Sequence, residues 1–400
     1  MTLTPARCSV AKPEGIRLSP KLYFLFVVTI FVAVDAVAAA ESVPATATFV
    51  VAAHDSSVRS QARADYVCDG ESDQEQINAA IRALPEPGGR VLLMEGHYDI
   101  RKVEDTLGGV IIDRSDVVLS GQGTATQLKQ APGQETNVIR IIGSGVGRIT
   151  ICDLFVDANR AHNFSGKGDP NVSHGRFEFC GIKAFYTYPG GPTGERNHHI
   201  TIRNCHVLNA HRLGIMLEGS HMKVVDNVLG NAGSDAVEIL TGPGEIRGNS
   251  FEITGPTHVA AGSDRANSIL MIGNTVRVKN GGRLDIGFRS WAKSRRHIIS
   301  NNVLTVDPGG QCTLAMDVRG DGAVVSENAI HTSNANEPVR LAITGGNTLV
   351  TGNLLENVIV EVNDETDEQN PILVKNNVLE NSRIEHRRGN LLTTTAQPSE

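Results

Sequence analysis

The chain has 400 residues, of which 40% are hydrophobic and 4% aromatic, with 37 Lys and Arg against 44 Asp and Glu. The hydrophobic share is that of a globular protein and excludes intrinsic disorder, and 16 Pro and 6 Cys are too few for a collagen or a disulfide scaffold. A net charge of −7 without a basic stripe argues against a dedicated nucleic-acid-binding protein, so we expect no nucleic-acid partner.

Residues 1–40 have the pattern of a signal peptide. Basic residues precede an apolar run from Leu22 to Val34, and Ala38 to Ala40 supply the small side chains that a signal peptidase needs. The run of about 13 apolar residues is shorter than the roughly 20 that span a bilayer. We predict cleavage after Ala40 and a secreted, periplasmic or cell-surface protein with no membrane attachment after cleavage.

From about residue 200 the sequence repeats a unit of short aliphatic strands separated by turns that contain Asn or Gly. Eight Asn residues mark the repeat at spacings of 22 to 28 residues: Asn204, Asn227, Asn249, Asn274, Asn302, Asn328, Asn353 and Asn377. Periods of this length indicate a solenoid, and Val and Ile alternating with polar residues indicate that its units are β-strands.

Asn at a fixed turn position has a physical reason. It tolerates a left-handed backbone, and its amide can hydrogen-bond to the equivalent amides of the coils above and below. We therefore expect an Asn ladder that holds the register. The residue after each Asn, such as Cys205 or Val228, is expected to point inward, and most of the cysteines are expected to be small core residues.

A helix is expected ahead of the first coil. Ser72 and Glu75 read as a capping box for a helix over about residues 73–84, and its apolar residues share one face: Ile77, Ala80, Ile81 and Leu84. Such a helix would cover the open end of a solenoid, whose strand edges would otherwise pair with other chains.

The domain boundaries follow from these elements. We assign residues 41–64 to an N-terminal linker and first strand, residues 65–390 to one solenoid domain, and residues 391–400 to a disordered tail. A long polar insertion over about residues 157–180 contains charged, His and aromatic residues, so we interpret it as the wall of a site.

The opening of the domain resembles the pectate-lyase-like superfamily of right-handed parallel β-helices, which includes pectate lyases, polygalacturonases, alginate epimerases and tailspike-type proteins. The matching residues are Asp69-Gly70, Asp73, Gly88-Gly89 and Gly96-x-Tyr98, with Met94-Glu95 where the superfamily commonly has Pro. The resemblance implies an all-β, single-stranded right-handed parallel β-helix with an N-terminal capping helix. Catalytic motifs of the superfamily do not transfer: Asp169-Pro170-Asn171 lacks the His of the epimerase motif.

The strands after the Gly turns supply the candidate site. With aliphatic residues inward by the period of two, their charged residues are expected to point outward into a groove. Asp285 and Asp317 are expected to be near neighbours, with Arg289 and Arg319 beside them. The catalytic candidates are Glu238, Asp285, Arg289, Asp317 and Arg319.

Further residues are candidates for binding a polysaccharide. Trp291, the single Trp, follows Arg289 on the same coil, and Tyr186 and Tyr188 could stack on sugar rings. The substrate-binding candidates are Lys183, Tyr186, Tyr188, Glu218 and Trp291. Asp and Glu side chains could also hold Ca²⁺ against an acidic substrate, but the sequence shows no metal motif.

Three functions remain open. The first is a carbohydrate-active enzyme that acts on a uronate polysaccharide by β-elimination or C5 epimerisation, with a base and a cation at the carboxylate. The second is a glycoside hydrolase of polygalacturonase type, with paired carboxylates such as Glu238 and Asp285 or Asp317. The third is a non-catalytic polysaccharide-binding or structural surface solenoid. Monomer and homotrimer, the latter common among tailspike-type relatives, both remain open.

Overall fold

The structure is a computed structural model that describes residues 47–104, 106–163, 179–184, 195–334, 336–363, 370–388 and 391–395. The predicted signal peptide and most of the predicted insertion lie outside the described residues. Within the described part, no helix is both long enough and apolar enough to cross a membrane.

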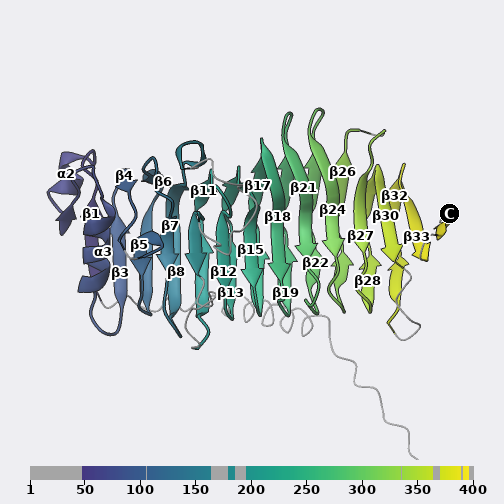
Figure 1. Ribbon diagram of the computed structural model, residues 1–400, viewed down its shortest axis with the longest axis horizontal. Coiled ribbons are helices and arrows are strands. Elements are labelled where there is room, and N and C mark those ends of the chain that lie inside the picture. Colours follow the sequence, from purple (N-terminus) through teal and green to yellow (C-terminus); the bar gives the residue numbers. More distant parts are fainter. Residues whose placement is uncertain are drawn as a thin grey trace, which may run out of the picture. The chain divides into compact units, whose positions relative to one another are not determined.

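The strands stack coil upon coil, and Figure 1 shows the coils following one another along the long axis from purple to yellow. Apart from the last strand, Leu391–Thr395, each strand pairs in parallel with the strand one coil later, as Asp235 to Leu240 pair with Val259 to Asp264. Because every coil contributes its strands to the same columns, residues about one repeat apart in sequence become neighbours. The predicted all-β parallel solenoid is confirmed.

One column forms a 12-stranded sheet. Its strands are β5 (Gly108–Ile112), β7 (Asn137–Ile141), β9 (Ile182–Ala184), β12 (Ile215–Glu218), β15 (Asp235–Leu240), β18 (Pro256–Asp264), β21 (Arg283–Ser290), β24 (Gln311–Val318), β27 (Val339–Ile343), β30 (Val358–Asn363), β33 (Arg383–Arg388) and β34 (Leu391–Thr395).

A 22-stranded sheet forms the remaining faces. It begins with β1 (Thr48–Ala52), β2 (Tyr66–Val67), β3 (Gly89–Leu93), β4 (Gly96–Ile100), β6 (Val117–Gln130) and β8 (Gly147–Asp157). One continuing column is β10 (His198–Arg203), β13 (Met222–Val225), β16 (Gly244–Arg247), β19 (Ile269–Ile272), β22 (Ile298–Ser300), β25 (Val324–Ser326), β28 (Thr348–Thr351) and β31 (Ile372–Lys375). The other is β11 (His206–Leu208), β14 (Val228–Gly230), β17 (Ser250–Ile253), β20 (Thr275–Val278), β23 (Val303–Val306), β26 (Ala329–Thr332), β29 (Leu354–Glu356) and β32 (Val378–Glu380).

The interior is one continuous apolar core that runs from Val51 to Ile384. Aliphatic side chains of equivalent positions stack on one another, so each coil buries its inner face only against its neighbours. The five described cysteines carry no disulfide, and four of them are buried. Burial raises the pKa of the Cys205 thiol to about 12, which fits its predicted role as a core residue and not a reactive thiol.

The predicted Asn ladder is present from Asn227 to Asn377. The Asn274 side-chain nitrogen donates to the Asn302 oxygen at 2.9 Å, and the Asn274 oxygen accepts from the Asn249 side chain at 3.0 Å. The same side-chain nitrogen also donates to the Ile246 carbonyl at 2.9 Å. Each buried amide is thus satisfied by the coils on either side, which holds the register.

The ladder and the left-handed backbone belong to two successive residues. The residue before each ladder Asn has a positive φ, as at Asp226 (57°) and Gly248 (66°), and the ladder Asn itself points inward. Asn204 therefore holds the left-handed position and not a ladder position, and Cys205 stands at the ladder position with its backbone nitrogen donating to the Asn227 side-chain oxygen at 2.9 Å. The prediction that the residue after each ladder Asn points inward was wrong by one position: Val303 and Val378, for example, are exposed.

The predicted helix is α3 (Gln74–Ala83), at the N-terminal end of the solenoid beside β1, β3 and β5 (Figure 1). Its expected apolar face is buried, from Ile77 to Leu84. The predicted capping box is wrong. Asp73 and not Ser72 is the N-cap, because Ser72 has a φ of 53° and lies outside the helix. Two short helical segments also occur, α2 (Val58–Gln61) and the 3₁₀ helix η1 (Arg160–His162).

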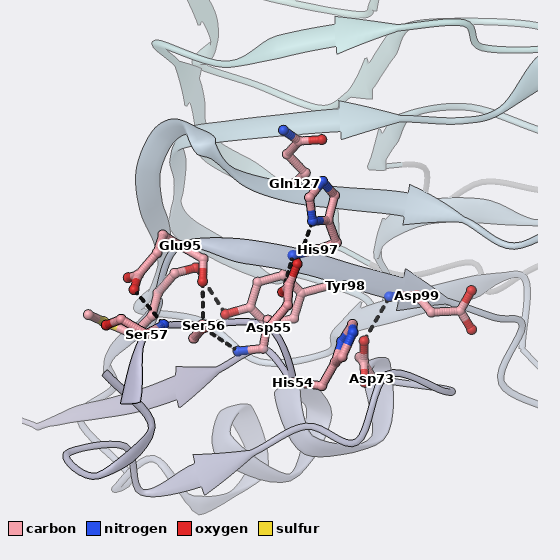
Figure 2. A network of polar contacts seen from close by, with 12 residues as sticks. His54, Asp55, Ser56, Ser57, Asp73, Glu95, His97, Tyr98, Asp99 and Gln127 are labelled. Carbon is pink, nitrogen blue, oxygen red and sulfur yellow. Dashed lines mark hydrogen bonds and ion pairs between the residues drawn. The ribbon is translucent and has the colours of Figure 1, made fainter. Parts of the chain in front are cut away.

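Asp73 ties the helix to the first coil (Figure 2). Its carboxylate accepts hydrogen bonds from the backbone nitrogens of Gly70 at 2.9 Å and Asp99 at 2.8 Å. Tyr98 is fully buried and donates from its hydroxyl to the Val51 carbonyl at 2.9 Å. The residues that carry the family resemblance therefore join the cap to the sheet.

Glu95, at the position where the superfamily commonly has Pro, makes its own contact in this network (Figure 2). Its carboxylate accepts from the Ser57 backbone nitrogen at 3.0 Å and from the Ser60 hydroxyl at 2.9 Å. These contacts anchor α2 against the strand ends, and the hydrogen bond from the Ser57 backbone holds the pKa of Glu95 below its usual value.

The C-terminal segment differs from the prediction. Leu391–Thr395 forms β34, antiparallel to β33, where we expected the start of a disordered tail. The antiparallel strand pairs with β33, the last parallel strand of the 12-stranded sheet, and so covers the outer edge of that strand.

The ladder predicts a specific loss of stability. Asn274→Ala would remove one side-chain partner from each of two neighbouring buried amides, Asn249 and Asn302, so we expect the free energy of unfolding to fall by about 1–3 kcal/mol. Denaturant unfolding followed by circular dichroism measures it. Thr275→Ala, at the exposed next position, should change stability by less than about 0.5 kcal/mol, and equal midpoints for the two variants would contradict the ladder's role.

Candidate functional site

The outer side of the 12-stranded sheet carries a row of mostly charged residues at one register position. Parallel pairing aligns Arg140, Lys183, Met216, Glu238, Gly262, Arg289 and Asp317 on successive strands from β7 to β24. The charged members are buried, whereas the sequence predicted an exposed groove. Charges in such surroundings must find partners, and their contacts define the site.

Arg289 is the centre of this row. Its Nη2 donates to Asp235 Oδ2 at 2.6 Å and to Glu238 Oε1 at 2.8 Å, although both acids lie two strands away on β15. The intervening strand presents Gly262, and a Cβ there would lie 3.4 Å from both Nε and Nη2 of Arg289. The missing side chain at Gly262 therefore leaves the space through which the guanidinium reaches both carboxylates.

The three side chains are held away from water. Their exposed fractions are 10% for Arg289, 11% for Glu238 and 3% for Asp235. Burial, followed by the charge of Asp235, raises the pKa of Glu238 to about 8, against the opposing effect of Arg289. Glu238 is thus mainly protonated at neutral pH, with one oxygen accepting from Arg289 and a proton available on the carboxyl group.

The Trp291 ring links Arg289 to a second arginine, Arg319. The Cζ atoms of Arg289 and Arg319 lie 5.2 Å and 4.2 Å from the centroid of the Trp291 ring. Arg319 in turn contacts Asp317, with Nη2 to Oδ2 at 2.8 Å and Nε to Oδ1 at 2.9 Å. The Arg319 side chain is 42% exposed, so this part of the cluster is accessible to solvent.

We call Asp235, Glu238, Arg289, Trp291, Asp317 and Arg319 the Arg289 cluster. It brings together four of the five residues predicted as catalytic, and Trp291 from the predicted binding residues. Lys183 and Glu218 are buried on the neighbouring strands β9 and β12. Tyr186 and Tyr188 lie outside the described residues.

Asp285 is separate from the cluster, contrary to the prediction that it neighbours Asp317. The register places Asp317 opposite Arg289, four residues further along β21 than Asp285. Asp285 instead contacts His258 at 3.1 Å and Arg283 at 3.7 Å, beside a pocket of about 380 Å³. A common strand does not by itself make two side chains neighbours.

Asp235 is the site residue that the sequence reasoning missed. It begins β15 three positions before Glu238, so strict alternation along a strand would place the two acids on opposite sides. The Arg289 contacts show that both face the same guanidinium. The available signal was a second acid on the strand that carries Glu238.

Among the residues that the structure describes, no three or more His, Cys, Asp or Glu side chains are arranged to hold a metal ion. The Arg289 cluster itself offers carboxyl groups, guanidinium groups and one aromatic ring. These can transfer a proton, stabilise developing charge and bind a polar ring.

Comparison with known proteins agrees with this architecture. Residues 133–276 match a family described as the right handed beta helix region. The chain is a right-handed parallel β-helix. The resemblance inferred from the opening residues is thus confirmed at the level of the fold, and no curated protein sequence matches the β-helix.

Solved structures similar to this β-helix come from different biological contexts. A DFA-IIIase from Arthrobacter chlorophenolicus A6 is 13% identical, with 85% of each chain covered and a TM-score of 0.51. The N-terminal fragment of bacteriophage Phi29 gene product 12 is 14% identical, with 78% of this chain and 61% of that chain covered and a TM-score of 0.52. The A-module of Azotobacter vinelandii mannuronan C-5 epimerase AlgE6 is 20% identical, with 79% and 96% covered and a TM-score of 0.49.

The raised pKa of Glu238 predicts how the stability of the β-helix depends on pH. Between its ordinary value of 4.5 and about 8, Glu238 holds its proton in the folded state and loses it in the unfolded chain. Folded protein then binds more protons, so this residue makes stability fall as the pH rises through that window. Glu238→Gln cannot ionise and should lose less stability between about pH 5 and pH 8 than the wild type. Denaturant unfolding at both pH values measures the difference, and the same decline in both proteins would contradict the raised pKa.

Proposed function

We propose that the protein is a carbohydrate-active enzyme that hydrolyses a glycosidic bond of a polysaccharide, with Glu238 as the general acid. The observation that carries the proposal is the buried Glu238, with its pKa raised to about 8, next to Asp235 on a shared guanidinium. Because the identities to solved β-helices are low, the proposal rests on the cluster and not on the fold.

Hydrolysis needs two carboxyl groups in different protonation states. One must donate a proton to the leaving oxygen, and the other must stay ionised to act on the sugar or on water. Glu238 fits the first role because it keeps its proton at neutral pH. Asp235 fits the second role because its carboxylate pairs with the Arg289 guanidinium at 2.6 Å.

The separation of the two acids favours one stereochemical course. Asp235 and Glu238 contact the same nitrogen of Arg289, so their contacting oxygens cannot be farther apart than these two contacts placed end to end. Retaining glycosidases hold their carboxyl groups about 5–5.5 Å apart and inverting ones about 6.5–9.5 Å. The short separation therefore supports retention of configuration.

A second candidate is β-elimination on a uronate polysaccharide. The observation in its favour is Arg319, a half-exposed cation beside Trp291, which could neutralise a uronate carboxylate. In that reaction Glu238 would act as a base in its ionised form. The two candidates thus need opposite protonation states of the same residue.

Substitution of Glu238 tests the proposal. Glu238→Gln keeps the size and the contact with Arg289 but has no acidic proton, so we expect reducing ends to form at least about 100-fold more slowly. The assay follows reducing ends and the ultraviolet absorbance of unsaturated uronate on a panel of neutral and acidic polysaccharides. The matched control is Glu252→Gln. Glu252 is an exposed acid on β17 that pairs with Lys279, and its substitution should leave the rate at the wild-type value.

The products separate the candidate functions. Reducing ends without absorbance support hydrolysis, whereas absorbance that depends on Glu238 supports elimination. Polymer binding without either product would support a non-catalytic, polysaccharide-binding solenoid. Full activity of the Glu238→Gln variant would show that Glu238 is not the general acid.

The pH dependence gives an independent test. A general acid works only while protonated, so we expect kcat/KM for hydrolysis to fall as the pH rises past about 8, where Glu238 ionises. A rate that instead rises through this pH would indicate that Glu238 acts as a base. Initial rates from pH 5 to pH 10 on the same polysaccharide measure the profile.

A further inference from the structure

A small apolar cluster lies on the outer side of the 12-stranded sheet, apart from the main core. Three buried residues and one partly buried residue form this outer apolar cluster: Cys180, Leu213, Met216 and Leu240. The two neighbours of Met216 in β12, Ile215 and Leu217, belong to the main core instead. Since successive side chains of a strand point to opposite faces, Met216 faces the side that carries the Arg289 cluster.

Met216 is the neighbour of Glu238 on the adjacent strand. Parallel pairing places Met216 of β12 opposite Glu238 of β15. Adjacent strands are about 4.8 Å apart, so these two side chains lie side by side. Leu240 of the same cluster follows two positions after Glu238 and points to the same side of β15. The outer apolar cluster therefore borders Glu238 on the side away from Arg289.

The two sides of Glu238 differ in what separates it from the next basic residue of the row. On one side Gly262 lies between Glu238 and Arg289, and its missing side chain lets the guanidinium reach Glu238. On the other side Met216 lies between Glu238 and Lys183, which is also two strands away. The Met216 side chain is fully buried, so it occupies the space that Gly262 leaves open on the opposite side.

This difference matters because ionisable groups surround Glu238. They lie on its own strand and on the elements packed against it: Asp235, Lys183, Arg212, Glu218, Asp264 and Arg289. Burial raises the pKa of Glu238 most, Asp235 raises it further, and Arg289 lowers it. Water or a second cation at the carboxyl group would favour its ionised form and release the proton.

We infer that Met216 is a positioning residue for the proposed reaction: it keeps water and Lys183 away from the Glu238 carboxyl group, so that Glu238 retains the proton it donates. Gly262 admits one cation to the carboxyl group, and Met216 excludes another. The inference rests on the proposed function for the use of the proton, whereas the proton itself can be followed without a substrate.

Met216→Ala tests the inference, because it opens the space between Glu238 and Lys183. We expect the alkaline fall in kcat/KM for hydrolysis, near pH 8 in the wild type, to move down by at least about one pH unit. Met216→Leu keeps an apolar side chain of similar size, so the midpoint of that fall should stay near pH 8. A purely structural role would change the rate and not the midpoint.

A second measurement needs no substrate. The free energy of unfolding of each protein is compared with that of its Glu238→Gln counterpart from pH 5 to pH 9, and the pH-dependent part of the difference reports the proton on Glu238. In the wild type this part should fall up to about pH 8. With Met216→Ala it should fall less and end at least about one pH unit lower, because the folded and unfolded states then release the proton at closer pH values.

Met271→Ala is the matched control. Met271 is also a fully buried methionine, but it lies in the main core on β19, so its truncation leaves a cavity there and does not open the space beside Glu238. It should move neither midpoint. Far-ultraviolet circular dichroism confirms that each variant is folded. If Met216→Ala does not fold, Met216→Gln, which places a polar group of similar length beside Glu238, should lower both midpoints instead.

Wild-type midpoints in both Met216→Ala and Met216→Gln would overturn the inference, and so would an equal shift in Met271→Ala. Failure of the proposed function is a separate result. It appears as an absence of hydrolysis in the wild type or as full hydrolysis by Glu238→Gln, and the unfolding comparison still reports whether Met216 holds the proton on Glu238.

Discussion

The backbone of each coil forms its sheet hydrogen bonds with the coil before it and the coil after it, and the position of every side chain follows from this pairing. Parallel pairing in register turns residues 22 to 28 positions apart into direct neighbours. The Asn ladder fixes the same register from inside, because each amide is satisfied only when the adjacent coils are aligned. A shift of one residue would break the ladder and move every polar side chain of the outer row.

The contacts of the Arg289 cluster depend on this alignment of neighbouring strands. Buried charges are costly unless they are paired, and Arg289 pairs with two acids two strands away because Gly262 leaves its path open. The arrangement leaves Glu238 mainly protonated at neutral pH. In the function that we propose, these two carboxyl groups act together on a glycosidic bond, and a rigid sheet positions them without a flexible loop.

The sequence by itself determined the solenoid, the apolar core, the position of the capping helix and the Asn ladder, because these depend on local periodicity and on residues that recur in every coil. It also indicated the charged residues on one face. Only the tertiary structure decided that the ladder Asn points inward while the residue before it adopts the left-handed backbone, that Asp235 joins Glu238, and that Asp285 lies apart. These outcomes depend on departures from strict alternation along a strand and on the reach of Arg289 over a glycine to residues more than 50 positions earlier in the chain. No period in the sequence encodes such a contact, because it is made across the sheet by a single long side chain.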